Sequence, residues 1–190
     1  MADLDAPSRT ALLVIDLQRG FFESEEMAAQ ADRIVAATNE LLRQASERGL
    51  PIFSVVTEHT PDRTTWTLSM LDDDQGFNYT GTEQADLLPG ITRVPGMHTV
   101  KKIRDSAFHA TDLAQRLRLA RVARVLICGV ESENCVALTG RDAFAYDFEA
   151  AICLDAVGSR KPERGRQALE DNRDEVRQPL LSLDEVPGWW

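Results

Sequence analysis

The sequence lacks the features of a membrane or exported protein. No apolar run approaches the roughly 20 residues that a membrane-spanning helix needs. The N-terminal segment MADLDAPSRT lacks the basic and apolar regions of a signal peptide, so we expect a cytoplasmic protein. Basic residues are also scarce, because 21 Lys and Arg stand against 31 Asp and Glu and give a net charge of −10. This balance argues against nucleic acid or an anionic membrane as a partner.

Cysteine is scarce as well. The sequence has three, Cys128, Cys135 and Cys153. They form no CxxC pair and show no Cys/His spacing typical of a zinc site. An odd number of cysteines in a reducing compartment indicates free thiols, whose reactivity depends on their surroundings. Internal repeats and low-complexity segments are absent too, so residues 1–190 are expected to form a single domain with a sizeable core.

What the sequence does contain is an alternation of strand and helix patterns. Continuous apolar runs are typical of strands covered on both faces of a sheet, and they occur at residues 11–17, 51–57, 124–130 and 149–157. Helical periodicity predicts helices over residues 25–48, 110–122, 135–148 and 163–176. The alternation predicts an α/β fold in which a parallel sheet has right-handed crossovers and helices on both faces.

Two segments do not fit this alternation. The longest irregular region runs from Glu58 to Thr99, and a loop of that length is usually a lid or a binding loop. Trp66 and Phe77 lie in it. They are candidates for closing over a bound small molecule, and simple packing of the loop is an equal alternative. The tail ends in Trp189 and Trp190, which we expect to pack on this chain or on a partner chain.

Three reactive side chains are placed where parallel sheets bind ligands, beyond the carboxyl ends of the strands. Asp16 ends the first predicted strand, Cys135 follows the strand at 124–130, and Lys102 lies in the extended segment MHTVKKI. Taken singly, each has an ordinary explanation: an aspartate that caps a loop, a solvated lysine and a small buried thiol. The last explanation is the one we adopt for the other two cysteines.

Together the three residues form a nucleophilic site. A thiol must lose its proton before it attacks. A carboxylate such as that of Asp16 can take this proton and return it to a leaving group. A helix N-terminus and the ammonium of Lys102 both stabilise a thiolate at Cys135. The site therefore needs no histidine.

Three segments that contain these residues resemble one family in their order and spacing. They are ALLVIDLQRGFF, KIRDSAF and CGVESENCVALTGRDAFAYDFE. They look like the signature segments of the isochorismatase-like cysteine hydrolases, which include nicotinamidases, N-carbamoylsarcosine amidases and isochorismatases. The resemblance runs from Ala11 to Ser159. It implies a three-layer, Rossmann-like sandwich with a six-stranded parallel sheet, and a homo-oligomer such as a dimer or tetramer.

The resemblance also implies roles for individual residues. Asp16 is the implied general base and acid, Lys102 holds charge beside it, and Cys135 is the nucleophile. A non-proline cis peptide is implied between Val130 and Glu131. The backbone amides of Glu131 and Cys135 would then form an oxyanion hole.

Two further residues belong to the first signature segment. Phe21 matches an aromatic position that lines the site in the family. Gln18 belongs to the DLQ motif, and we expect it to orient the loop rather than react.

The resemblance narrows the chemistry but not the substrate. Nicotinamidases resemble one another in an Asp-x-His segment that helps bind a divalent metal, whereas here Glu58 and His59 are followed by no histidine before His98. We therefore expect no metal, no cofactor and a substrate other than nicotinamide. Some isochorismatases lack the cysteine, so Cys135 favours C–N bond hydrolysis of a small carboxamide or carbamoyl compound through a thioester. An isochorismatase that uses Asp16 as an acid is one alternative, and a catalytically silent binding subunit is another.

Overall fold

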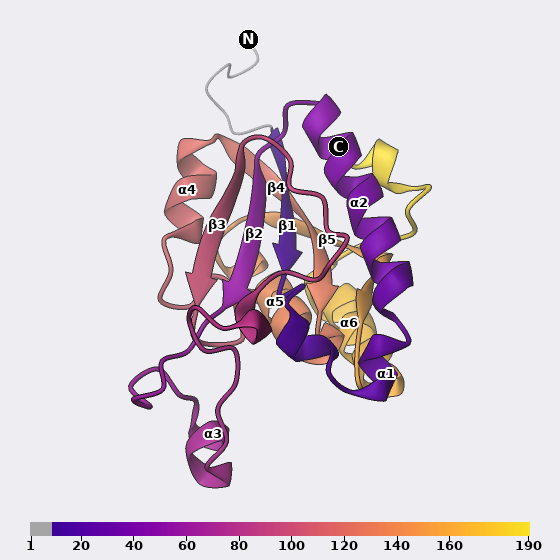
Figure 1. Ribbon diagram of the computed structural model, residues 1–190. Coiled ribbons are helices and arrows are strands. Elements are labelled where there is room, and N and C mark those ends of the chain that lie inside the picture. Colours follow the sequence, from indigo (N-terminus) through magenta and orange to yellow (C-terminus); the bar gives the residue numbers. More distant parts are fainter. Residues whose placement is uncertain (1–8) are drawn as a thin grey trace.

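The computed structural model describes residues 9–190 (Figure 1). Residues 1–8, which make up most of the segment tested above for a signal peptide, lie outside the described residues. Across residues 9–190, no helix is long and apolar enough to cross a membrane.

One parallel sheet forms the centre of the described chain. Its strands are β1 (Arg9–Ile15), β2 (Ile52–Thr57), β3 (Met97–Lys102), β4 (Val122–Val130), β5 (Glu149–Gly158) and β6 (Leu180–Leu181). Their order in the sheet is β3-β2-β1-β4-β5-β6, and every neighbouring pair is parallel. The chain runs outward from β1 in both directions, so β1 and β4 border the point where open α/β sheets bind ligands. The predicted α/β fold with six parallel strands is confirmed.

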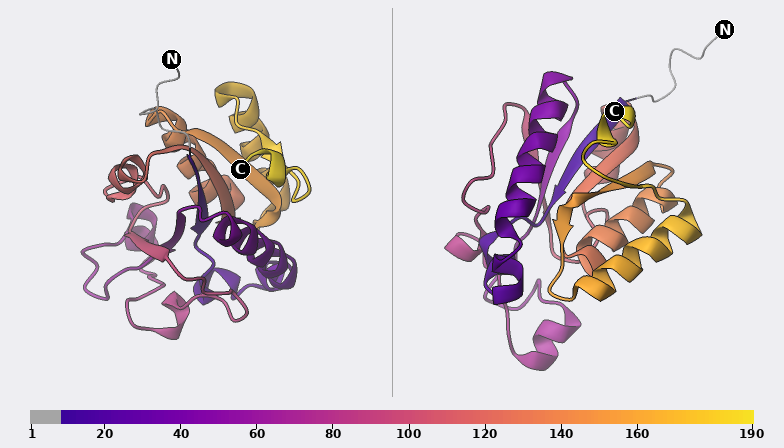
Figure 2. Two further views of the ribbon diagram at one scale, coloured as in Figure 1. Left: turned by 90° about the horizontal axis from the view of Figure 1, so that it is seen from above. Right: turned by 90° about the vertical axis from the view of Figure 1, so that its right-hand side faces the viewer.

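Helices cover both faces of this sheet (Figure 2). One face carries α1 (Glu25–Ala28) and α2 (Ala31–Glu47), and the other carries α4 (Leu113–Leu119), α5 (Ala137–Ala145) and α6 (Pro162–Val176). Successive residues of a strand point to opposite faces. In β1, Leu12 packs into the core beneath α2, whereas Leu13 packs into the core beneath α4 to α6, and both are fully buried. Burial on both sides explains why the strands read as continuous apolar runs.

The helix predicted over residues 25–48 is two helices. Ser24 caps α1 by accepting a hydrogen bond from the backbone N–H of Met27. At the junction, the side-chain amide of Gln30 donates to the carbonyl of Ser159 at 2.9 Å. This contact ties the junction to the loop that follows β5.

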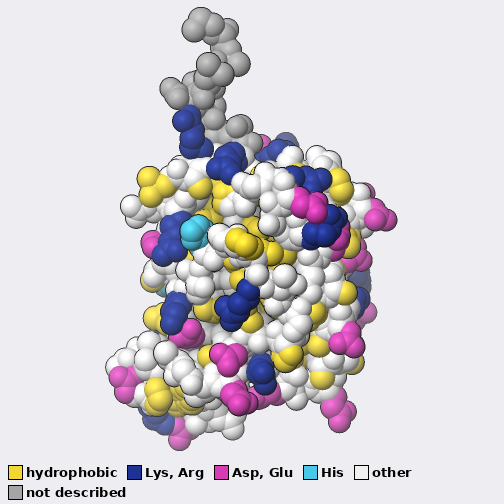
Figure 3. Space-filling model, turned by 45° about the horizontal axis from the view of Figure 1, so that its top comes forward, with side chains coloured by type: hydrophobic (Ala, Val, Ile, Leu, Met, Phe, Trp, Pro, Cys, Tyr) yellow, Lys and Arg dark blue, Asp and Glu magenta, His cyan; other side chains and the backbone are white. Residues whose placement is uncertain are grey.

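The irregular region contains a short α-helix, α3 (Leu68–Asp73), and a 3₁₀ turn at Glu83–Ala85. Helix α3 projects from the body beyond the carboxyl ends of the strands (Figure 1). An ion pair between Arg63 and Asp74 connects the two ends of this projection. Figure 3 shows basic and acidic side chains interspersed over this face of the molecule.

The tryptophan tail packs on its own chain. The indole Nε1 of Trp190 donates to the side chain of Gln44 on α2 at 2.9 Å, and the guanidinium of Arg124 lies 5.3 Å from the ring centre of Trp189. Trp189 and Trp190 were expected to pack on this chain or on a partner chain, and they pack on this chain. Burial of this tail therefore gives no reason to expect a partner chain.

Candidate active site

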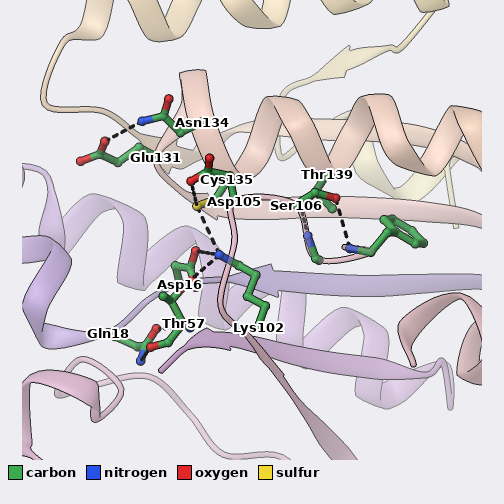
Figure 4. Close-up of polar contacts among 12 residues, drawn as sticks. Asp16, Gln18, Thr57, Lys102, Asp105, Ser106, Glu131, Asn134, Cys135 and Thr139 are labelled. Carbon is green, nitrogen blue, oxygen red and sulfur yellow. Dashed lines mark hydrogen bonds and ion pairs between the residues drawn. The ribbon is translucent and has the colours of Figure 1, made fainter. Parts of the chain in front are cut away.

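The strand order brings four side chains together at one edge of the sheet. Lys102 is the last residue of β3, Thr57 is the last residue of β2, and Asp16 and Cys135 follow β1 and β4. These strands are neighbours in the order β3-β2-β1-β4. Since parallel strands end at the same edge, side chains from four distant parts of the sequence converge there (Figure 4).

Lys102 is the centre of this group. Its Nζ lies 2.7 Å from Asp16 Oδ2, 2.6 Å from Thr57 Oγ1 and 3.3 Å from Cys135 Sγ. An ammonium has three N–H donors, so each donor has one partner. The side chains of Lys102 and Asp16 are 1% and 0% exposed, so the two opposite charges balance each other almost without water.

Electrostatics hold the thiol protonated at rest. Burial raises the pKa of the Cys135 thiol well above its usual range, the charge of Asp16 acts in the same direction, and Lys102 only opposes them. Burial is the largest influence on the pKa of Lys102 and acts to lower it, but the charges and hydrogen bonds of Asp16 and Cys135 together outweigh burial, and the net direction is upward. Lys102 thus acts on the Cys135 pKa in the expected direction, but burial and Asp16 outweigh it. Desolvation disfavours any charged form and dominates here.

A tight approach of two strands shapes the backbone before the cysteine. Gly129 in β4 has a φ of 119°, and a Cβ there would lie 1.9 Å from the carbonyl oxygen of Ile15 in β1, so only glycine fits. The next peptide bond, Val130–Glu131, is cis, at the position that the family resemblance implied. The chain then enters a π-helical turn, Ser132–Val136, which carries Cys135 to the site. The oxyanion hole at the amides of Glu131 and Cys135 stays a prediction.

A cavity of about 280 Å³ opens onto Cys135 and Lys102. Phe21 and Phe77 both line it, with ring centres 5.4 Å apart in an edge-to-face arrangement. Trp66 is not among the lining residues. Its ring stacks on Tyr79 and its Nε1 donates to the carbonyl of Thr60 at 3.0 Å, so Trp66 packs within the loop.

Charged side chains to which the sequence reasoning assigned no role also line the cavity. Glu131 accepts a hydrogen bond from Arg160 Nε at 2.5 Å and one from Asn134 Nδ2 at 3.3 Å. Asp105 Oδ1 lies 3.9 Å from Cys135 Sγ. Asp105 and Glu131 belong to the two signature segments KIRDSAF and CGVESENC, so the motifs could have indicated them.

Thr57 was also missed, because it ends an apolar run and reads as a strand residue. Its backbone is held by Gln18, whose Oε1 accepts from Thr57 N–H at 2.8 Å and whose Nε2 donates to the Thr57 carbonyl at 2.9 Å. Gln18 also donates to the carbonyl of Ala85 at 2.8 Å. These contacts agree with the expectation that Gln18 orients the loop.

Glu58 and His59, the candidate remnants of a metal-binding segment, are not joined by further ligands in the described residues. Glu58 pairs with Lys101 at 2.8 Å. His59 Nδ1 lies 3.0 Å from the carbonyl of Thr65, which can only accept, so Nδ1 carries the proton. Burial lowers the pKa of His59 and favours its neutral form. Within residues 9–190, no group of three or more His, Cys, Asp or Glu side chains is arranged to hold a metal ion.

Comparison with known proteins relates the chain to isochorismatase-like proteins. Residues 10–182 match the model of the isochorismatase domain. The chain is 30% identical over 164 residues to a probable inactive nicotinamidase from Arabidopsis thaliana, covering 81% of this chain and 83% of the relative. It is 26% identical over 181 residues to a probable isochorismatase from Pseudomonas chlororaphis, covering 95% of this chain and 86% of the relative.

A solved structure agrees with these matches. The crystal structure of an isochorismatase family protein from Desulfovibrio vulgaris is 27% identical, covers 96% of this chain and 98% of its own, and superposes with a TM-score of 0.86. The names of the relatives include both amidases and isochorismatases, so the comparisons establish the family but not the reaction. The chain belongs to the isochorismatase family, a superfamily of hydrolases.

Proposed function

We propose that the protein is a metal-independent cysteine hydrolase that cleaves a C–N bond in a small carboxamide or carbamoyl compound. One observation carries the proposal: the buried Lys102 ammonium contacts both Asp16, at 2.7 Å, and the Cys135 sulfur, at 3.3 Å. A carboxylate and a thiol that share one cation at the wall of a cavity are suited to exchange a proton. The cavity of about 280 Å³ suits a small substrate.

The first half of the proposed reaction forms a thioester. Since the thiol is protonated at rest, Asp16 takes its proton as Sγ attacks the substrate carbonyl carbon. The carbonyl π pair moves to oxygen, and the backbone N–H groups of Glu131 and Cys135 hold the resulting oxyanion. The C–N bond then breaks, and the leaving nitrogen takes the proton from Asp16 and departs as ammonia or an amine.

The second half restores the thiol. Water gives a proton to Asp16 as its oxygen attacks the thioester carbonyl carbon. The C–S bond breaks, the carboxylic or carbamic acid leaves, and the Cys135 sulfur recovers the proton from Asp16. Lys102 keeps its charge throughout and offsets whichever of the carboxylate or the thiolate is negative at each stage.

Two alternatives predict different chemistry. An isochorismatase would use Asp16 to protonate a vinyl ether and release pyruvate, and this reaction needs no thiol. The relative from Pseudomonas chlororaphis, which is named a probable isochorismatase, keeps this alternative open. A silent subunit would turn over neither kind of compound. The complete set of Asp16, Lys102 and Cys135 in contact argues against a silent subunit.

The test measures two products from the same preparations. Wild-type protein is incubated with a panel of small carboxamides and carbamoyl compounds, and ammonia is measured. Isochorismate is supplied separately, and pyruvate is measured. Cys135→Ser and Asp16→Asn are compared with the control variant Cys153→Ser, which changes a buried thiol outside the cavity.

The proposal expects ammonia release that both site variants lose and the control retains. Brief treatment with iodoacetamide should also abolish it. Pyruvate release that survives both Cys135→Ser and iodoacetamide would instead establish the acid-only reaction. Absence of both products across the panels would favour the silent subunit.

A further inference from the structure

We infer that Thr57 is a positioning residue of this site, whose hydroxyl is fixed by Lys102 so that it donates to Asp16 and keeps the carboxylate in its proton-accepting form. The inference rests on the proposed function, in which Asp16 takes the proton of Cys135. Thr57 acts through Asp16 and is not assigned a direct role on the substrate.

The direction of the hydroxyl follows from its partners. Lys102 Nζ lies 2.6 Å from Thr57 Oγ1, and an ammonium can only donate, so the hydroxyl oxygen accepts this bond. The single hydroxyl proton is then free to go to Asp16 Oδ1, which lies 2.9 Å away. A hydroxyl usually rotates between partners, but this one has a defined orientation.

The carboxylate benefits from that orientation. Asp16 is fully buried, so water cannot supply the hydrogen bonds that a carboxylate needs. Oδ2 faces the Lys102 ammonium at 2.7 Å and Oδ1 accepts from Thr57. A hydrogen bond to the charged form of an acid favours that form. Thr57 therefore supplies the second donor that holds Asp16 ionised while Cys135 is still protonated.

The fold holds Thr57 at this point from two sides. In the sheet, β2 lies between β1 and β3, and Thr57 is paired in register with Lys102. On the other side, Gln18 binds both the N–H and the carbonyl of Thr57, at 2.8 and 2.9 Å. The backbone is thus fixed without help from the Thr57 side chain, so a substitution there is expected to change the hydroxyl and little else.

The experiment compares Thr57→Val, which has a similar shape but no hydroxyl, with Thr57→Ser, which keeps the hydroxyl. Thr38→Val is the matched control, because Thr38 is also buried but lies on α2, outside the cavity. The readout is the rate of Cys135 alkylation by iodoacetamide between pH 4 and 9, followed by mass spectrometry. This rate needs no substrate. Thermal unfolding checks that each variant is folded.

The expected result is an acid limb in the wild-type profile, where alkylation slows because the Cys135 thiolate forms less readily as the pH falls. Thr57→Val should move this limb to higher pH by about one unit, and should slow alkylation on the limb about tenfold. Thr57→Ser and Thr38→Val should keep the wild-type profile. Once the panel identifies a substrate, Thr57→Val should lower kcat and leave KM unchanged.

An unmoved limb in folded Thr57→Val, or the same shift in Thr57→Ser, would overturn the inference. Thr57→Ala removes the hydroxyl without adding an apolar group beside Lys102, and it replaces Thr57→Val if that variant does not fold. A wild-type profile with no acid limb that depends on Asp16 would contradict the proposed function itself. The two failures are therefore distinguishable.

Discussion

Replacing Lys102 by methionine removes the ammonium and keeps most of the side-chain volume. Asp16 would then be a carboxylate with 0% exposure and no counter-charge. Removing one partner of a buried ion pair typically costs about 3 to 5 kcal/mol, because the remaining charge is uncompensated. Since the free energy of unfolding of a typical protein is about 5 to 15 kcal/mol, Lys102→Met should lose a large part of its stability as well as its activity.

The adjacent lysine provides the control. Lys101 lies next to Lys102 but is 61% exposed, and it pairs with Glu58 at 2.8 Å near the surface. An exposed ion pair contributes about 0 to 1 kcal/mol. Lys101→Met should therefore lower the free energy of unfolding by less than about 1 kcal/mol and leave activity in place.

A double variant separates charge from packing. Asp16→Asn with Lys102→Met removes both charges, and neutral replacement of a buried pair is often tolerated. Its stability should recover toward that of the wild type although the site is inactive. Equilibrium unfolding in guanidinium chloride measures the free energy of unfolding of the wild type, the two single variants and the double variant. The reasoning is refuted if Lys102→Met and Lys101→Met lose the same stability, or if the double variant is less stable than Lys102→Met.

Three further predictions concern the whole chain. Cys135 should be alkylated by iodoacetamide before Cys128 and Cys153 in peptide mapping at pH 8, because Cys135 lines the cavity beside Asp16 and Lys102, whereas the other two thiols are fully buried outside that cavity; earlier labelling of either would contradict this. Activity should survive EDTA, because no group of three or more His, Cys, Asp or Glu side chains within residues 9–190 is arranged to hold a metal ion; loss of activity that a divalent ion restores would disprove it. We also expect a homo-oligomer, as the family resemblance implies, and light scattering that finds only a 21.1 kDa species would exclude it.

The parts of the fold that are buried on both faces were predictable. β1, β2, β4 and β5 coincide with the apolar runs, because strands between two helical layers need apolar residues at nearly every position. β6 was not predictable, since Leu180–Leu181 is too short to form a pattern. The break between α1 and α2 was missed because Gln30 makes its contact with Ser159, far away in the sequence.

The site was predictable for a related reason, but only in part. Asp16, Lys102 and Cys135 follow or end strands, and parallel strands end together. The net direction of the Cys135 pKa was not predictable, because burial outweighs the effect of Lys102 on the thiol, and sequence does not give the extent of burial. Thr57 could not be recognised either, since the strand order that places β2 between β1 and β3 is a property of the folded sheet.

The full occupation of the Lys102 ammonium has a consequence for specificity. Its three donors are committed to Asp16, Thr57 and Cys135, so none is left for an incoming molecule. Choice among ligands must then come from side chains that reach the cavity from other segments, such as Met70 on α3 and Arg104 after β3. The buried charged residues and the residues that contact the ligand therefore lie in different parts of the chain. Substitutions in the projecting segment can change which compound binds without changing the buried charges.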